Sequence, residues 1–430
     1  MQPSFAAKLV SRIFLTLLLA AILPTPAHAQ TFTVLHTFKG TDGGSPLGVL
    51  ITDGAGNVYG TTSGGGTGTK CPNYSDFGCG TAFVLNKTGK EIGLYSFNGS
   101  NGAGPYAGLL RDPSGNFFGT TLAGGTDAQA CGGTQGFGCG VAFRLTRTGK
   151  EILYEFKGTP DDESPESPLV EDTAGNFYGT TYQGGADGLG SVFKIDAAGK
   201  ETVLHSFAGP PEGGGDGALS YTGVILDAAD NLYGVTASGG AFGAGVVYRL
   251  DAAGQETLLY SFTGSSDGGG PDSVLLSDPQ GNLYGTTTGG GNLACQGGDG
   301  CGVIFELSPQ PGGTWTEAVL YTFCSLENCA DGERPLRGPL VMDLTGNLYG
   351  TTYFGGAYRN CDGDGCGVVF ELGATGAETV LHSFTGGSDG ANPFSGLATD
   401  SFGNLYGTTQ AGGATCFTFY TCGVVFKIIP

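Results

Sequence analysis

Short apolar runs separated by turn residues follow one another along the chain from about residue 30 onward. In one representative stretch, four strand-like runs span residues 167–171, 176–182, 190–195 and 202–207. Tight turns that contain Asp and Gly join the first run to the second and the third run to the fourth. The pattern therefore predicts four-stranded antiparallel meanders and no long helices.

This four-stranded unit is repeated seven times. Its core phrase reads Asp-x-x-Gly-Asn-apolar-aromatic-Gly-Thr-Thr, and the copies lie 51 to 65 residues apart, with their Asn at Asn57, Asn116, Asn176, Asn231, Asn282, Asn347 and Asn404. The fourth copy departs most, because Asp230 replaces the Gly and Val235 replaces the first Thr. A four-stranded sheet cannot bury both of its faces alone, so radial stacking of the units into a β-propeller is predicted.

The two ends of the chain indicate a closed ring. Residues 33–38 match the fourth strand of the unit, whereas residues 423–428 match the third strand. Seven units are complete only if the N-terminal strand finishes the last sheet, which removes the exposed seam of the ring. An open solenoid would have no reason to split a unit in this way. We therefore expect an all-β, seven-bladed β-propeller that forms a single domain over residues 30–430.

Three recurrent motifs resemble those of the choice-of-anchor GloVer tandem-repeat proteins. They are Val-Leu-[His/Tyr]-Ser-Phe-x-Gly, Gly-Asn-Leu-Tyr-Gly-Thr-Thr-x-x-Gly-Gly and Gly-Val-Val-Phe-[Lys/Glu]-[Leu/Ile], and the resemblance extends over residues 31–430. It implies a secreted bacterial repeat protein, often held by a C-terminal sorting anchor, and brings no activity with it. The sequence ends at Pro430, directly after a predicted strand, which departs from the anchored members.

Composition and the N-terminus narrow the cellular setting. Among 430 residues, 39 are acidic and 18 are basic, so the net charge of -21 makes nucleic-acid binding unfavourable. Residues 1–29 resemble a secretory signal peptide, with Lys8 and Arg12 ahead of an apolar run over 13–23 and Ala27 and Ala29 at the cleavage site. We expect a soluble, secreted or periplasmic protein with no membrane span after cleavage.

The twelve cysteines form six close pairs in the sequence. These pairs are Cys71 and Cys79, Cys131 and Cys139, Cys295 and Cys301, Cys324 and Cys329, Cys361 and Cys366, and Cys416 and Cys422. In a secreted chain, close pairs of this kind predict disulfides. Zinc sites would require Cys-x-x-Cys spacing or nearby histidines, and neither occurs.

Most recurrent polar and aromatic residues have structural explanations. A carboxylate that begins the first turn of every unit is expected to build that turn, as at Asp53, Asp112, Asp172, Asp227, Asp278, Asp343 and Asp400. The aromatic residue of the phrase is expected in the core, as at Tyr59, Phe118, Tyr178, Tyr233, Tyr284, Tyr349 and Tyr406. Beyond the signal segment, histidine occurs only at His36, His205 and His382, in the outer strand, so no catalytic or cofactor-binding residue is predicted.

A second recurrent acidic set follows the fourth strand and is our candidate ligand-binding face. It comprises Asp42, Asn101, Asp216, Asp267, Asp331 and Asp389, with Asp161 and Asp162 nearby in the third unit. We expect these residues to border the channel mouth together with the disulfide loops. Asp362 and Asp364, inside one such loop, are weak candidates for calcium, which is the only cofactor considered. Because Asp-Gly is a common turn dipeptide, repetition alone also explains the set.

These features favour a monomeric binding or scaffold module, with an extracellular polysaccharide or a surface protein as partner. One alternative is a carboxylate-dependent propeller enzyme, either a polysaccharide lyase or a glycosidase. Another is a structural surface-layer or adhesion protein. An enzyme predicts unrepeated Asp, Glu, Tyr or Arg residues at the channel mouth, whereas a scaffold predicts a nearly symmetric channel.

Overall fold

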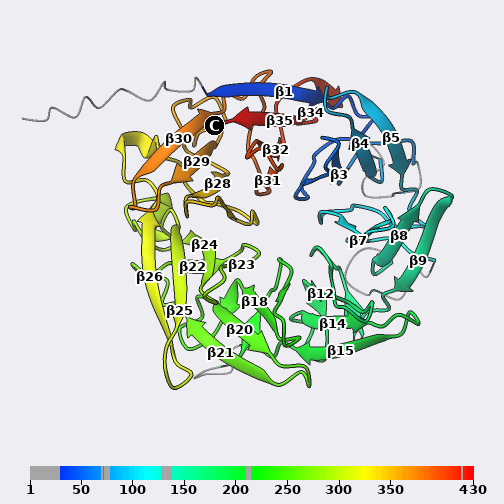
Figure 1. Ribbon diagram of the computed structural model, residues 1–430, viewed down its shortest axis with the longest axis horizontal. Helices are drawn as coiled ribbons and strands as arrows, with labels where there is room; N and C mark the ends of the chain where they lie inside the picture. The colour runs from blue at the N-terminus through cyan, green and yellow to red at the C-terminus, as the bar shows by residue number, and fades with distance from the viewer. Residues whose placement is uncertain are drawn as a thin grey trace, which may run out of the picture.

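Seven antiparallel sheets stand around a central channel in a closed ring (Figure 1). The computed structural model describes residues 30–68, 71, 78–126, 131, 138–159, 161–209, 215–361, 363–417 and 420–430. The expected signal segment, residues 1–29, lies outside the described residues. The predicted all-β, seven-bladed propeller is confirmed.

Each blade places its shortest strand at the channel and its fourth strand at the rim (Figure 1). From the channel outward, blades 1 to 4 contain β2 (Ile51–Thr52), β3 (Val58–Thr62), β4 (Thr81–Leu85) and β5 (Glu91–Ser96); β6 (Leu110–Arg111), β7 (Phe117–Thr121), β8 (Val141–Thr146) and β9 (Gly149–Glu155); β11 (Val170–Glu171), β12 (Phe177–Thr181), β14 (Ser191–Ile195) and β15 (Glu201–Ser206); and β17 (Ile225–Leu226), β18 (Leu232–Thr236), β20 (Val246–Leu250) and β21 (Glu256–Ser261). Blades 5 to 7 contain β23 (Leu276–Ser277), β24 (Leu283–Gly289), β25 (Val303–Pro309) and β26 (Trp315–Thr322); β27 (Val341–Met342), β28 (Leu348–Thr352), β29 (Val368–Leu372) and β30 (Glu378–Ser383); and β31 (Ala398–Thr399), β32 (Leu405–Thr409), β35 (Val424–Ile429) and β1 (Thr31–Thr37).

Short ladders and turns lie in the links on the face where one blade leads to the next. The ladders pair β10 (Asp162–Glu163) with β13 (Gln183–Gly184), β16 (Gly217–Ala218) with β19 (Ser238–Gly239), β22 (Gly269–Pro271) with β24, and β33 (Thr415–Phe417) with β34 (Tyr420–Thr421). Two 3-10 turns, η2 (Gln296–Gly298) and η3 (Glu327–Cys329), lie in the same links.

The N-terminal strand completes the last blade, as the repeat phase predicts. β1 pairs antiparallel with β35, so blade 7 is built from both ends of the chain. Phe32 of β1 stacks on His382 of blade 6 at a ring-centroid distance of 3.7 Å. Phe38, just beyond β1, packs edge-on against Phe83 of blade 1 at 5.2 Å. The closing strand therefore contacts both neighbouring blades.

Aromatic rings form the contacts between consecutive blades. A buried Phe at the end of each outer strand packs edge-to-face against the central aromatic ring of the next blade, with centroids 5.1 to 5.3 Å apart. The pairs are Phe38–Phe83, Phe97–Phe143, Phe156–Phe193, Phe207–Tyr248, Phe262–Phe305, Phe323–Phe370 and Phe384–Phe426. Such pairs add about 0.5–1.5 kcal/mol each beyond the burial of their area. The repeat thus encodes its own packing between blades.

The recurrent Asp builds the first turn of each blade, as expected. In blade 1, Asp53 Oδ1 accepts hydrogen bonds from the N–H groups of Ala55 and Asn57. Its Oδ2 accepts from the side chain of Asn57 and from the Tyr59 hydroxyl. Gly56 closes this turn with a φ of 80°, a left-handed conformation that favours glycine. Tyr59 is thereby held in the core by its ring and at the turn by its hydroxyl.

The innermost strands are shorter than the sequence pattern predicts. In blade 3, β11 begins at Val170, although the apolar run begins at Ser167. The Ser167 hydroxyl accepts from the N–H of Thr180 and donates to the carbonyl of the same residue. A side chain therefore replaces the backbone ladder at Ser167, and the ladder with β12 begins only at Val170.

Tyr248 replaces the central Phe in the fourth blade and offers a stability test. The side chain is fully buried, and its hydroxyl has no hydrogen-bond partner among the described residues. Because an unsatisfied buried hydroxyl is unfavourable, Tyr248→Phe is expected to raise the free energy of unfolding by about 1 kcal/mol, measured by chemical denaturation. The reverse change in blade 5, Phe305→Tyr, should lower it. Destabilisation by Tyr248→Phe would contradict this explanation.

All six predicted disulfides are present. They join Cys71–Cys79, Cys131–Cys139, Cys295–Cys301, Cys324–Cys329, Cys361–Cys366 and Cys416–Cys422, and the described residues include no free cysteine. Five of them close the link between the second and third strands of a blade. Such bonds persist in oxidising compartments, which agrees with an extracellular or periplasmic setting. No helix in the described part of the chain is long and apolar enough to cross a membrane.

Candidate ligand-binding site

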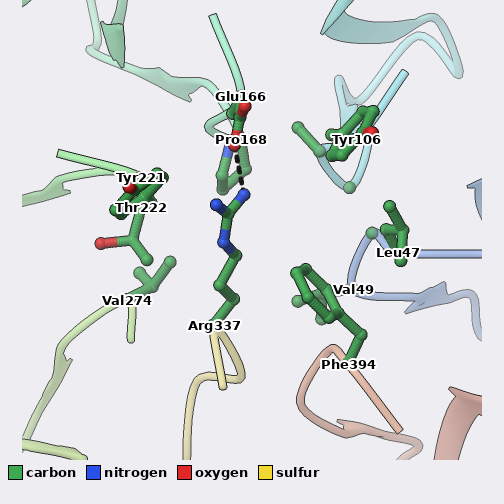
Figure 2. A pocket seen from close by; sticks show the side chains of 13 residues that line it. Leu47, Val49, Tyr106, Glu166, Pro168, Tyr221, Thr222, Val274, Arg337 and Phe394 are labelled. Atoms are coloured by element: carbon green, nitrogen blue, oxygen red, sulfur yellow. Dashed lines mark hydrogen bonds and ion pairs between the residues drawn. The ribbon is translucent and has the colours of Figure 1, made fainter. Parts of the chain in front are cut away.

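A ring of seven side chains of six types surrounds one mouth of the channel. Each blade contributes the residue that leads into its innermost strand, directly after a Pro in five blades. The ring consists of Leu47, Tyr106, Glu166, Tyr221, Asp272, Arg337 and Phe394, and Figure 2 shows Arg337 in contact with Glu166, with Tyr221 on one side of the cavity and Leu47, Tyr106 and Phe394 on the other. The surrounding sequence is repeated, but the residue at this position varies among the blades, so the mouth is asymmetric.

Arg337 of blade 6 reaches across the channel and contacts four other blades. Its Nη1 donates to Oε2 of Glu166 in blade 3, and its Nε lies 3.7 Å from Oδ2 of Asp272 in blade 5. The guanidinium carbon lies 4.4 Å from the ring centroid of Tyr221 in blade 4 and 5.3 Å from that of Phe394 in blade 7. The guanidinium is thus the centre of the site.

The backbone that presents Arg337 is strained. Blade 6 has one residue more than the other blades between the Pro and the innermost strand. Arg337 lies at the apex of the resulting tight bend with a φ of 44°, and the N–H of Gly338 donates to the carbonyl of Leu336. A left-handed conformation costs a residue other than glycine about 1–3 kcal/mol and is frequently found at functional sites. Here it directs the side chain into the channel.

The charges of the site are shifted by burial and by one another. Burial raises the pKa of Asp272 to about 7, although the neighbouring Arg337 charge opposes the rise. Burial acts against the charge of Arg337, but Glu166 and Asp272 raise its pKa overall. Arg337 is therefore cationic, whereas Asp272 is divided between its neutral and ionised forms near neutral pH. Asp272 Oδ1 has no partner among the described residues.

Aromatic rings form the walls around this cluster. Tyr221 stacks on Tyr182 with centroids 4.7 Å apart, and Phe394 meets Tyr353 edge-on at 6.0 Å. Tyr106 lies on the side of the cavity opposite Tyr221, which is also the side of Phe394 (Figure 2). Burial and the hydrogen bond with Tyr182 raise the pKa of Tyr221, so its phenol is a poor base near neutral pH.

The space left among these side chains is small. The cavity has a volume of about 30 Å³, which is room for one or two water molecules. A ligand can therefore insert one small group toward Arg337 while its remainder lies over the aromatic mouth.

The predicted acidic face lies elsewhere. Each of its residues contacts the side chain of the outer strand that precedes it, through the pairs Asp42–His36, Asn101–Tyr95, Asp161–Tyr154, Asp216–His205, Asp267–Tyr260, Asp331–Tyr321 and Asp389–His382. In every pair the Asp or Asn also accepts a backbone N–H of its own turn. The side chains are held at the rim, not at the channel mouth where we expected them. Asp162 is fully buried and bonded to Ser191.

Metal binding stays a prediction. Glu91 joins His36 and Asp42 at one rim position, and Glu256 joins His205 and Asp216 at another, close enough for shared ligation. Tyr takes the place of His in four other blades and makes the same contact, which indicates a hydrogen-bonding role. Of the calcium candidates, Asp362 lies outside the described residues, and the backbone of Asp364 closes the loop between β28 and β29.

The residues of the channel mouth were not predicted from the sequence. The sequence did contain a signal, because this position of the repeat varies among the seven copies, with Tyr the one residue type that occurs twice. However, nothing in the sequence indicated which of these seven side chains would be in contact with one another. The long separation between Glu166 and Arg337, 171 residues, made their ion pair unpredictable.

Comparisons with known proteins place the chain in a family and support the fold. The sequence model of the Gloeobacter/Verrucomicrobia repeat matches residues 128–328 and 293–430. No curated protein matches the chain. Among solved structures, the extracellular domain of a candidate one-component system from B. thetaiotaomicron is 11% identical, with a TM-score of 0.51 over 92% of this chain and 40% of that one.

Two further structures are enzymes with lower scores. A PL25 ulvan lyase bound to a saccharide is 12% identical, with a TM-score of 0.48 over 88% of this chain and 90% of that one. A luciferin-regenerating enzyme is 12% identical, with a TM-score of 0.43 over 93% of this chain and 95% of that one. At these identities such likenesses concern the fold and no activity.

Proposed function

This chain belongs to the Gloeobacter/Verrucomicrobia repeat family, and from that premise we propose that it is a secreted propeller that binds saccharides at the mouth of its channel. The observation that carries the proposal is the asymmetric ring around Arg337. A purely structural repeat has no reason to place six different residue types at the corresponding positions of seven blades, because identical residues would pack equally well.

The chemistry of the ring suits a sugar. Tyr106, Tyr221 and Phe394 offer ring faces and edges, on which the apolar face of a sugar can pack. Arg337 and Glu166 supply donors and acceptors for hydroxyl groups in the middle of that aromatic surface. Specific small-molecule sites commonly combine aromatic walls with a few polar groups in this way.

The test is a binding screen of the oxidised chain against oligosaccharides and polysaccharides by thermal shift and calorimetry. A ligand present at 100 times its dissociation constant stabilises the fold by about 2.7 kcal/mol. Tyr106→Ala and Phe394→Ala are each expected to weaken saccharide binding at least about tenfold, because an aromatic contact of this kind contributes at least about 1 kcal/mol.

Phe402→Ala is the matched control. Phe402 is 88% exposed in the first turn of blade 7, away from the channel mouth, so its removal should leave the affinity unchanged. Equal weakening by Phe402→Ala and Phe394→Ala would contradict a site at the channel mouth. Absence of binding to every saccharide would favour a protein partner or a structural role instead.

A carboxylate-dependent enzyme is the second candidate, and Asp272 is the observation that favours it. A carboxyl group with a pKa of about 7 can act as a general acid or base. Its free Oδ1 is buried, however, and its Oδ2 faces Arg337, so substrate access requires rearrangement. Assays for new reducing ends and for unsaturated uronate products decide the matter. If the chain turns over a saccharide and Asp272→Asn abolishes that turnover, the protein is an enzyme and not a binding module.

A further inference from the structure

We propose that the channel mouth selects uncharged saccharides and rejects uronate and sulfated ones, an inference that rests on saccharide binding at this site. The charges around Arg337 carry it. A lone exposed arginine would attract an anionic sugar by a bidentate contact. Arg337 instead faces Glu166 and Asp272, and these two carboxyl groups determine whether an anionic or a neutral sugar is favoured.

The positive charge of Arg337 is already balanced within the protein. Glu166 occupies one edge of the guanidinium, and its side chain is only 10% exposed. Asp272 lies beside Nε and is 9% exposed. With two carboxyl groups facing a single guanidinium, the cluster has no spare positive charge. A ligand carboxylate would add a further anion to a site that has no spare cation.

Nearby basic residues do not change this balance. Arg334 is the nearest other arginine along the chain, and it faces the exposed Asp299 at 3.9 Å. The ring itself contributes no further cation, since its other members are Leu, Tyr and Phe. Within the described residues, the mouth therefore offers Arg337 with Glu166 and Asp272 as its charged groups.

The negative charge of the whole molecule also disfavours anionic sugars. The sequence carries a net charge of -21, and removal of residues 1–29 would take away only basic groups. Such a surface repels a polyanion before contact, and low-dielectric walls concentrate the field at a channel. Hydroxyl groups, in contrast, can accept from Arg337 and donate to Glu166 without any cost in net charge.

The experiment compares sugars that differ only in charge. Oligomers of glucose, galactose and mannose are measured against the corresponding glucuronate, galacturonate and mannuronate oligomers by calorimetry in 150 mM salt. The chain is expected to prefer the neutral member of at least one pair by about tenfold or more, because like-charge contacts are strongly unfavourable.

Glu166→Gln tests the cause directly. The Gln carbonyl can still accept from Arg337, but the balancing charge is gone, so the preference should shrink about tenfold or reverse. Asp299→Asn is the matched control, since it removes the same formal charge from a side chain that is 80% exposed and outside the ring. It should leave the preference unchanged.

Two results would overturn the inference while saccharide binding stands. One is tighter binding of the uronate oligomers by the unmodified chain. The other is an equal change of preference in Glu166→Gln and Asp299→Asn, which would assign selectivity to overall charge. If no oligomer of either kind binds, the proposed function itself fails and the inference falls with it.

Discussion

A chain that lacks residues 30–38 is expected to lose its folded monomeric state and to aggregate. The deletion removes β1, which forms the outer strand of blade 7 and pairs with β35 along Thr31–Thr37. It leaves the apolar edge of β35, Val424–Ile429, without a partner. Exposed apolar edges of this kind pair with other chains.

The loss extends beyond one ladder, because β1 links three blades. Phe38 is fully buried and packs on Phe83 of blade 1, while Phe32 stacks on His382 of blade 6. Loss of a fully buried Phe alone costs about 3–5 kcal/mol. Because domain stabilities are commonly about 5–15 kcal/mol, removal of the whole strand should consume most of the stability of the ring.

Size-exclusion chromatography and thermal unfolding of the truncated chain provide the measurement. A chain that begins at Gln30 is the control and should fold normally. A synthetic peptide of residues 30–40, added in trans, should restore the monomer if the missing strand is the cause. Phe38→Ala gives a graded version with an intact strand. A truncated chain that melts cooperatively as a monomer, within a few degrees of the control, would contradict closure by β1.

The melting temperature is expected to be highest near pH 5 and to fall by roughly 3–6 °C between pH 5 and pH 8.5. The cause is a set of glutamates in the outer strands, each beside an acidic residue of the neighbouring blade. Burial raises the pKa of Glu201 to about 8 and those of Glu256, Glu317 and Glu378 to about 7. The buried Oε1 atom of each of these glutamates has no hydrogen-bond partner among the described residues, although that of Glu256 lies 3.8 Å from His205 Nε2.

The sign follows from proton binding. Between the ordinary glutamate pKa and the raised one, the folded state holds more protons than the unfolded state. Stability is therefore present in mild acid and is lost as the pH rises through about 7 to 8. Each ionised glutamate then lies beside an acidic residue that repels it, as Glu317 beside Asp267 and Glu378 beside Asp331.

The aspartates of the first turn in each blade determine how stability falls at low pH. Burial alone would raise the pKa values of these carboxyl groups, but hydrogen bonds from the turn lower them overall. The residues are Asp53, Asp112, Asp172, Asp227, Asp278, Asp343 and Asp400. Their stabilisation is present above the ordinary aspartate pKa and is lost as the pH falls below it. Stability should therefore decline on both sides of about pH 5.

A double variant separates the rim from other titrating groups. Glu317→Gln with Glu378→Gln keeps the shape of both side chains and removes their charge, so the fall toward pH 8.5 should become shallower. Glu327→Gln, an exposed change in η3, should leave the profile as it is. A profile that stays equally steep in the double variant would show that these glutamates are not its cause.

The repeat alone was sufficient to predict the architecture. Each copy carries its own turn signal, as in Asp53 with Gly56, and its own strand pattern, so local preference and global fold agree. The split unit at the two ends predicted closure by the N-terminal strand, because an unpaired edge is unfavourable. Close spacing predicted the disulfides, such as Cys361–Cys366, since a short loop holds its two cysteines within reach.

The candidate acidic face was identified as a set but placed wrongly in space. The sequence indicated that a carboxylate follows each outer strand, and also that His or Tyr occupies one position of that strand. It contained no distance between the two positions. The structure joins them, as in Asp216 with His205 and Asp331 with Tyr321, since the turn folds back on the strand that precedes it.

Sequence by itself determined the periodic properties of this protein, namely its seven blades, their turns and their disulfides, because the repeat, each turn and each cysteine pair depend on residues close together in the chain. Only the tertiary structure decided the channel mouth. There, ring closure brings one position from every blade to a common axis, and Arg337 meets Glu166 and Asp272 from distant units. The variable position of the repeat has no visible pattern along the chain, and its role becomes clear only where the seven blades place it around one axis.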